Sequence, residues 1–283
     1  MEAIEFNWDI HHKCNYRCPY CFFYGQWQKL SKFNKYFSVE QWIDAWHRIY
    51  EKYGSVHIII SGGEPIIYPS FFDLIKELLK EHTIEIITNL SCSQEQLVDF
   101  MNHLPLNRLE FGISFHPLFT SFETFLEKVL FIKNKGIFFT INYVAYPPEL
   151  RRISYFKDKF IQNELDIIIL PFRGEYNDIV YPQGYTEKEK SSIYNLSSSL
   201  SLVQKKQLDQ FMNLNKSKGK LCYAGQRYAR INPDGQVLRC APDKKILGYL
   251  FDRDFSLLEH PMPCESEECF CEFIYVDSIV KDN

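Results

Sequence analysis

The sequence predicts an α/β protein, a partial (β/α)6 TIM-like barrel with a small cysteine-rich domain at its C-terminal end. Three observations favour this fold. Short apolar runs alternate with amphipathic stretches up to about residue 172, as in the strand–helix units of a parallel sheet. Polar and cysteine residues follow the ends of these runs, where the functional loops of barrels lie. Five of the nine cysteines come after residue 221, in a loop-rich segment.

Six apolar runs rich in Ile, Val or Phe predict strands that are buried on both faces. They span residues 3–10, 55–61, 83–88, 108–114, 138–144 and 166–170. Helices are predicted between them near residues 39–52, 70–80, 94–103, 121–134 and 150–161. Capping-box pairs mark three of the helix starts, at Ser38 with Gln41, Ser93 with Gln96, and Thr120 with Glu123. Helix ends are expected at Gly54 and Gly136.

The pattern divides the chain into three segments. Residues 1–175 form the predicted barrel, residues 176–215 a helical linker, and residues 216–283 the cysteine-rich domain. Two further helices, near 187–196 and 202–215, are expected to start at Thr186 with Glu189 and at Ser201 with Gln204. Residues 173–200 are otherwise polar and rich in tyrosine, and they predict no clear strand.

Charge and hydropathy exclude several classes of protein. The formal net charge of −4 gives no overall positive field that would favour nucleic acid. Residues 1–10 carry acidic but no basic side chains, unlike a secretory signal. No run of about 18 apolar residues predicts a membrane span. We therefore expect a cytoplasmic protein with no nucleic-acid or membrane partner.

The first cysteine group has the pattern C-x3-C-x2-C and follows the first predicted strand. It consists of Cys14, Cys18 and Cys21. A [4Fe–4S] cluster normally takes four thiolates, so three cysteines in one loop leave one iron open for a ligand. A zinc site with His11 or His12 as fourth ligand is the alternative reading of the same residues.

The loop resembles that of the radical S-adenosylmethionine (SAM) superfamily, with Tyr20 just before the last cysteine. The second predicted strand ends in Ser-Gly-Gly-Glu-Pro, which is similar to the GGEP motif of that family. The resemblance implies that Gly62, Gly63, Glu64 and Pro65 bind the amino group of SAM, while SAM chelates the open iron. Glycines permit the close approach of backbone that such binding needs.

The resemblance also implies weaker contacts to SAM at later strand ends. Tyr20 belongs to the same set, and the others are Thr88 and Asn89 after the third strand, Ser114 on the fourth, Asn142 on the fifth and Leu170 on the sixth. Many members of the family have Asp soon after the serine of the fourth strand. Here Phe115 and His116 follow Ser114, which puts the contacts from this strand in doubt.

The second cysteine group surrounds a predicted hairpin. The pair Asp234-Gly235 between alternating stretches favours a tight turn, which would bring Cys222 and Cys240 together. The spacing C-x12-G-x4-C is similar to that of SPASM and twitch domains, and implies a twitch-like domain with one auxiliary [4Fe–4S] cluster. Cys222 and Cys240 are the expected ligands, completed by two of Cys264, Cys269 and Cys271. The remaining thiol would be spare, or a hydrogen donor in catalysis. Alternatively, one iron of this cluster stays open for the substrate.

The resemblance implies an enzyme that cleaves SAM reductively to a 5′-deoxyadenosyl radical, which takes a hydrogen atom from the substrate. We expect oxidation (dehydrogenation) or epimerisation of a small molecule, such as a sugar or aminocyclitol, because no peptide-recognition segment precedes the first predicted strand. Modification of a ribosomal peptide, by cross-linking or epimerisation, is the alternative. A flavodoxin- or ferredoxin-type partner would supply the electron. A non-catalytic zinc scaffold and a ferredoxin-like electron carrier are the rivals from other classes.

Overall fold

The computed structural model describes residues 4–102 and 104–269. Within them, one open nine-stranded sheet has the order β13-β12-β11-β1-β2-β3-β4-β5-β6. All six strands predicted for the barrel are present, and each pairs in parallel with the next. They are β1 (Glu5–His11), β2 (His57–Gly62), β3 (Thr83–Thr88), β4 (Leu109–Ser114), β5 (Phe138–Ala145) and β6 (Ile168–Pro171).

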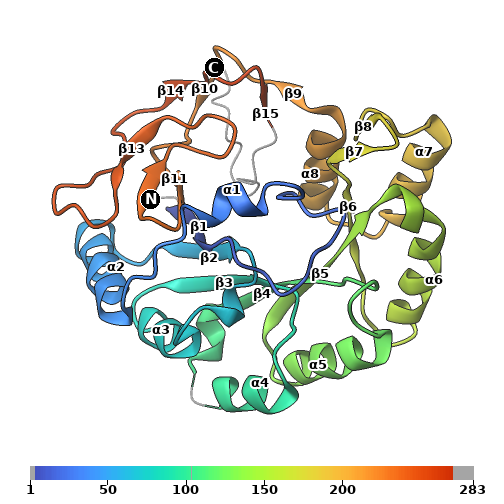
Figure 1. Cartoon of the computed structure of the whole chain (residues 1–283), viewed down its shortest axis with the longest axis horizontal. Coiled ribbons are helices and arrows are strands. Elements are labelled where there is room, and N and C mark those ends of the chain that lie inside the picture. Colours follow the sequence, from blue (N-terminus) through green and yellow to red (C-terminus); the bar gives the residue numbers. More distant parts are fainter. Residues whose placement is uncertain (1–3, 103, 270–283) are drawn as a thin grey trace.

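Helices connect the parallel strands and cover the outer face of the sheet (Figure 1). They are α2 (Val39–Tyr53), α3 (Phe71–Leu78), α4 (Gln94–Met101), α5 (Phe122–Asn134) and α6 (Leu150–Ile161), with short 3-10 turns at Pro65–Ile67, Leu106–Arg108 and Pro147–Glu149. The capping boxes at Ser38 and Ser93 are confirmed. The predicted cap at Thr120 is wrong by one residue, because the Thr120 amide donates to His116 in the preceding turn and the Ser121 hydroxyl caps α5 instead.

Aromatic side chains fill the space between the sheet and its helices. Trp8 of β1 packs against Trp42 and Trp46 of α2, with ring centroids 4.4 and 5.6 Å apart. Under α5 and α6, Phe115 contacts Phe160 at 5.5 Å in an edge-to-face arrangement. Such pairs add to the free energy gained by burying the rings, and they fix the sheet whose opposite, inner face carries the candidate site.

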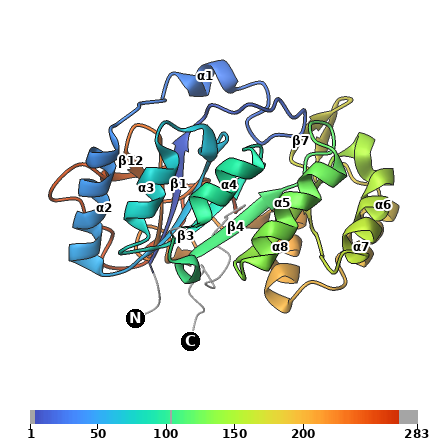
Figure 2. The same ribbon diagram turned by 90° about the horizontal axis from the view of Figure 1, so that it is seen from below.

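The sequence analysis did not predict a helix after the first cysteine group or a hairpin after β6. A short helix, α1 (Trp27–Ser31), follows the first cysteine group and lies beyond the C-terminal ends of the strands (Figure 2). After β6, strands β7 (Gly174–Tyr176) and β8 (Ile179–Tyr181) form an antiparallel hairpin in the segment predicted to lack strands. The predicted linker helices are confirmed as α7 (Glu187–Leu196) and α8 (Leu202–Asn213), with the expected capping boxes.

The C-terminal segment adds three strands to the same sheet. Strand β11 (Tyr228–Ile231) pairs in parallel with β1, and the turn at Asp234-Gly235 joins it to β12 (Gln236–Leu238) and then β13 (Ile246–Tyr249). The other strands of this segment are β9 (Asn215–Lys216), β10 (Leu221–Cys222), β14 (Met262–Pro263) and β15 (Glu268–Cys269). None of the described helices is both long and apolar enough to cross a membrane.

A buried ion pair joins β1 to β11. The Arg230 guanidinium donates to Asp9 Oδ2 from Nη2 (2.6 Å) and from Nε (3.2 Å), and Ser61 Oγ donates to Asp9 Oδ1 (3.0 Å). Both charged side chains are almost fully buried. Removing one member of such a pair leaves an uncompensated buried charge, which is strongly destabilising.

We therefore predict that Arg230→Met lowers the free energy of unfolding by about 3 kcal/mol. Urea unfolding followed by circular dichroism measures this change. The exposed Arg253 is the control, and Arg253→Met should leave the transition within experimental error. An Arg230→Met transition that coincides with wild type would show that the ion pair contributes nothing.

Candidate functional site

The three cysteines of the first group follow β1 in one tight loop. The Cys21 amide donates to the Cys18 carbonyl oxygen (3.1 Å), and the amides of Tyr16 and Phe23 donate to the sulfurs of Cys14 and Cys21 (3.4 Å each). Burial raises the pKa of all three thiols, to about 12 at Cys18 and about 11 at Cys21. Because a bound metal deprotonates a coordinating thiol outright, these residues suit a metal centre better than reactive-thiol chemistry.

The Gly-Gly-Glu-Pro segment after β2 is locked to this loop through the backbone. Gly63 donates its amide to the His11 carbonyl oxygen (2.7 Å), and Glu64 donates to that of Lys13 (2.9 Å). A Cβ atom on Gly63 would lie 1.9 Å from the Lys13 carbonyl oxygen, and Gly62 has a positive φ of 113°. Only glycines permit this approach, so the two predicted motifs form one structural unit.

The carboxylate of Glu64 is buried inside the protein. It accepts hydrogen bonds from Thr88 Oγ1 (2.6 Å) and the amide of Asn89 (2.7 Å), both at the end of β3, and from the amide of Ile66 (3.3 Å). Burial raises its pKa to about 7, against the effect of these three donors. The side chain of Glu64 thus ties β2 to β3, and its oxygens are engaged within the fold.

The two histidines before the cysteines have structural contacts. The fully buried His11 ring donates from Nε2 to the Glu64 carbonyl oxygen (2.8 Å) and packs edge-on against Tyr68. His12 packs against Phe23 (5.2 Å). Burial lowers the pKa of both rings. Within residues 4–102 and 104–269, no three His, Cys, Asp or Glu side chains are placed to hold a single metal ion.

The predicted strand-end residues fall into two groups. Thr88 and Asn89 contact the loops directly, and Asn89 Nδ2 lies 3.9 Å from Cys14 Sγ. Ser114, Asn142 and Leu170 line one cavity of about 270 Å³ on the inner face of the sheet. Ser114 and Asn142 are neighbours in the register of β4 and β5. The structure therefore gathers every predicted strand-end residue around the C-terminal edge of the sheet.

Tyr20 contacts His116, a residue that the sequence indicated only as a departure from the family pattern. The Tyr20 hydroxyl is hydrogen-bonded to His116 Nδ1 (3.2 Å), and the two rings stack with centroids 5.6 Å apart. Burial lowers the His116 pKa to about 4, so the imidazole is neutral at pH 7. His116 thereby connects the loop after β4 to the cysteine loop.

Four cysteines of the second group line one small cavity. They are Cys222, Cys240, Cys264 and Cys269. Burial raises the pKa of Cys222, and that of Cys240 to about 12. The hairpin was predicted to bring Cys222 and Cys240 together, and their position in the same cavity confirms this. Cys271 lies outside the described residues.

A buried arginine holds the loops that carry these cysteines, and no sequence signal predicted it. Arg239 is only 1% exposed and pairs with Asp243 through Nη1 (2.6 Å). The same guanidinium donates to the carbonyl oxygens of Ala224 (2.9 Å) and Pro263 (2.7 Å). Its fixed fork of donors connects three separate chain segments beside the four thiols.

The contact between Gly63 and Lys13 predicts the effect of adding one methyl group. Gly63→Ala forces the Lys13 carbonyl away, so we expect the protein to take up less iron during anaerobic reconstitution. Iron counting measures this loss. In the control Gly54→Ala, the residue has a positive φ but faces open space, so it should lose about 1 kcal/mol of stability and no iron. Equal iron in both variants would contradict the prediction.

The fold has been seen before, in proteins of low sequence identity. Native anSMEcpe with bound AdoMet matches with a TM-score of 0.62 and 18% identity, over 88% of this chain and 78% of that one. Native anSMEcpe with bound AdoMet and Cp18Cys peptide matches with a TM-score of 0.61, at the same identity and coverage. At this identity the likeness shows the fold alone. No curated protein matches the sequence.

The sequence itself carries the family assignment. The model of the radical SAM superfamily matches residues 8–152, which is 145 of the 283 residues. This range includes the three cysteines, the Gly-Gly-Glu-Pro segment locked to them, and the ends of β3, β4 and β5. The match covers just over half of the chain and the site that the geometry singles out, and the chain therefore belongs to the radical SAM superfamily.

Proposed function

We propose that this protein is a radical SAM enzyme that oxidises or epimerises a small molecule. The observation that carries the proposal is the backbone lock between the cysteine loop and the Gly-Gly-Glu-Pro segment, centred on Gly63. Three thiols and a strand-end loop held in register are what a cluster with one open iron, and a ligand bound to that iron, require. A flavodoxin- or ferredoxin-type protein is the proposed source of electrons.

Cys14, Cys18 and Cys21 are the proposed ligands of a [4Fe–4S] cluster. When bound, the cluster and SAM supply a 5′-deoxyadenosyl radical that takes a hydrogen atom from the substrate. Because the Glu64 carboxylate is bonded within the fold, we assign the contact with the SAM amino group to the backbone of Gly62 and Gly63. The Glu64 side chain positions that backbone.

The proposed contacts to the rest of SAM are three residues that line the inner cavity, Ser114, Asn142 and Leu170. Ser114 and Asn142 face the same space from neighbouring strands and offer hydroxyl and amide groups to a ribose. Leu170 supplies an apolar wall on β6. Tyr20, held by His116, covers the cysteine loop and helps to exclude water from it.

The second cysteine group is the proposed site of an auxiliary [4Fe–4S] cluster. Cys222 and Cys240 were the expected ligands, and their common cavity with Cys264 and Cys269 favours these two as the remaining ones. Cys271 is then the spare thiol. A cluster with four thiolates can accept the second electron of a dehydrogenation.

The fate of the substrate radical separates the two proposed outcomes. Oxidation needs the auxiliary site as electron acceptor. Epimerisation needs a thiol, here Cys271, that returns a hydrogen atom to the opposite face and then regains an electron and a proton. Solvent deuterium in the product would support epimerisation, whereas an unlabelled, oxidised product would support dehydrogenation.

Modification of a peptide is the second candidate. It is favoured by the shared fold with anSMEcpe, a protein whose structure with AdoMet and a peptide is similar over most of this chain. Incubation with small amino sugars and with cysteine- or serine-containing peptides, followed by mass spectrometry, would distinguish the two substrate classes.

We predict that Cys18→Ala abolishes 5′-deoxyadenosine formation from SAM under reducing conditions, because the cluster loses one of its three ligands. The control is Cys92→Ala, which removes a buried thiol outside both cysteine groups and should retain activity. Chromatographic measurement of deoxyadenosine checks both. Activity in Cys18→Ala at the wild-type level would refute the ligand assignment.

We predict that Cys240→Ala lowers the iron content from about eight to about four atoms per chain, since one of two [4Fe–4S] clusters is lost. Uncoupled deoxyadenosine formation should persist, because the first group of cysteines is intact. Iron analysis and electron paramagnetic resonance give the two readings. Unchanged iron would remove Cys240 from the proposed ligands.

A further inference from the structure

The cavity on the inner face of the sheet continues below the proposed SAM contacts. Towards the N-terminal ends of the strands it is lined by Glu85 of β3, Thr140 of β5 and Gln207 of α8. Helix α8 packs against β6 and closes this side of the cavity. A volume of about 270 Å³ is near the small end of the ~300–1,000 Å³ range of ligand sites.

Glu85 lies in the N-terminal half of β3 and lines this cavity. It stands three residues before Thr88, so at roughly 3.3 Å per residue it is about 10 Å below the strand end that contacts the cysteine loop. Its neighbour in the β4 register is a second carboxylate, Glu110. Among the described residues, no side chain donates a hydrogen bond or forms an ion pair with Glu85.

A glycine on the next strand makes room for this carboxylate. A Cβ atom on Gly112 would lie 3.0 Å from Glu85 Oε1 and 2.4 Å from the end of the Ile87 side chain. Glycine inside a strand weakens it, and often marks a place where another group approaches closely. Here the vacant position above Gly112 lets the Glu85 carboxylate extend over β4.

The surroundings favour one kind of ligand. Burial, and then repulsion from Glu110, raise the Glu85 pKa to about 7. A buried carboxylate is costly unless a cation or a donor accompanies it. A divalent metal would need about six oxygen ligands, whereas Ile59, Ile87 and Ile168 make much of this wall apolar. An alkylammonium ion matches both the charge and the apolar surface.

We propose that this cavity is the substrate site and that Glu85 binds a primary ammonium group of a small substrate. The identity of the occupant as substrate rests on the proposed function, which places SAM at the upper rim. Thr140 and Gln207 offer hydroxyl and amide groups to polar substituents of the same molecule.

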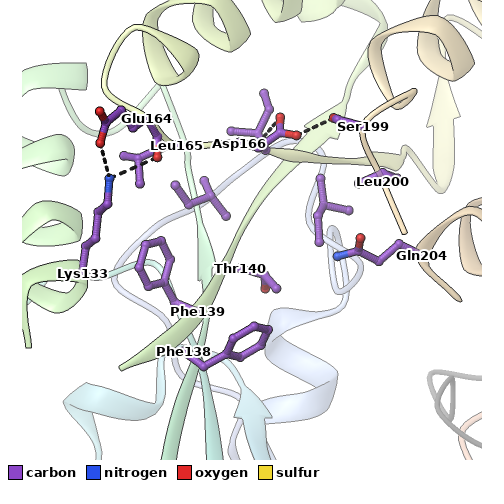
Figure 3. Close-up of a pocket in the computed structure, with 13 residues that line it drawn as sticks. Lys133, Phe138, Phe139, Thr140, Glu164, Leu165, Asp166, Ser199, Leu200 and Gln204 are labelled. Carbon is purple, nitrogen blue, oxygen red and sulfur yellow. Dashed lines mark hydrogen bonds and ion pairs between the residues drawn. The ribbon is translucent and has the colours of Figure 1, made fainter. Parts of the chain in front are cut away.

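A second cavity borders this site. It has a volume of about 370 Å³, lies at the β5–β6 edge, and shares Thr140, Ile168 and Gln204 with the inner cavity. Figure 3 shows the Gln204 side-chain amide directed towards Thr140 from the opposite wall. A small molecule entering beside Gln204 would reach Glu85 without passing the cysteine loop.

Binding of three cyclohexyl compounds of similar size but different charge tests the proposal. Cyclohexylammonium, cyclohexanol and cyclohexanecarboxylate are titrated calorimetrically into the reconstituted full chain at about pH 8, where a carboxyl of pKa about 7 is ionised. We expect the ammonium to bind at least about tenfold more tightly than the alcohol, and the carboxylate to bind most weakly. Glu85→Gln should abolish this preference, and Glu95→Gln, which changes an exposed carboxylate, should keep it.

Equal affinity of wild type for the three probes would overturn the proposal, and this comparison needs no variant to fold. Retention of the preference in Glu85→Gln would also overturn it. So would loss of SAM affinity in Glu85→Gln with the amine preference unchanged, because Glu85 would then belong to the cofactor site. Binding of the probes requires no cleavage of SAM. A chain that prefers the ammonium but makes no deoxyadenosine would refute the proposed function alone.

Discussion

Gly63 and the carbonyl oxygen of Lys13 lie so close that no side chain fits between them. This contact joins two loops that are about 50 residues apart in sequence and follow neighbouring parallel strands. It fixes the distance between the three cysteines and the Gly-Gly-Glu-Pro backbone. The Glu64 carboxylate extends the same constraint to β3, so that three strand ends form one unit. The SAM contacts that we propose on β4, β5 and β6 can act together with this unit only if their distance from it is fixed.

Buried acidic and thiol groups concentrate on the inner side and C-terminal edge of the sheet. The three thiols of the first group, Glu64 and Glu85 all have raised pKa values because burial penalises their charged forms. Perturbed groups of this kind cluster at functional sites. The environments of Glu64 and Glu85 differ, and the difference indicates different roles. Glu64 has three donors from the protein, whereas Glu85 has none among the described residues and faces a cavity. We therefore treat Glu64 as a positioning residue and Glu85 as a binding residue.

Much of the parallel sheet could be predicted from the sequence because its strands are short segments rich in apolar residues that alternate with amphipathic helices. Two of these helices, α2 and α4, begin at predicted capping boxes. The same local signals predicted the hairpin at Asp234-Gly235. Three features depend on contacts between distant residues, and local patterns could not reveal them. They are the parallel pairing of β11 with β1, the hydrogen bonds by which Arg239 connects three chain segments, and the position of Glu85 in a cavity wall without a hydrogen-bond donor among the described residues. The hairpin of β7 and β8 was missed because each of its strands has only three residues and lies in a segment that is polar as a whole.

The central claim is that the loop of Cys14, Cys18 and Cys21 holds a cluster that cleaves SAM. The most direct test is to reconstitute the wild-type chain with iron and sulfide without oxygen, add SAM and a strong reductant, and measure deoxyadenosine together with bound metal. We expect deoxyadenosine, and about eight iron atoms if both cysteine groups hold [4Fe–4S] clusters. Tightly bound zinc with no deoxyadenosine would contradict the claim.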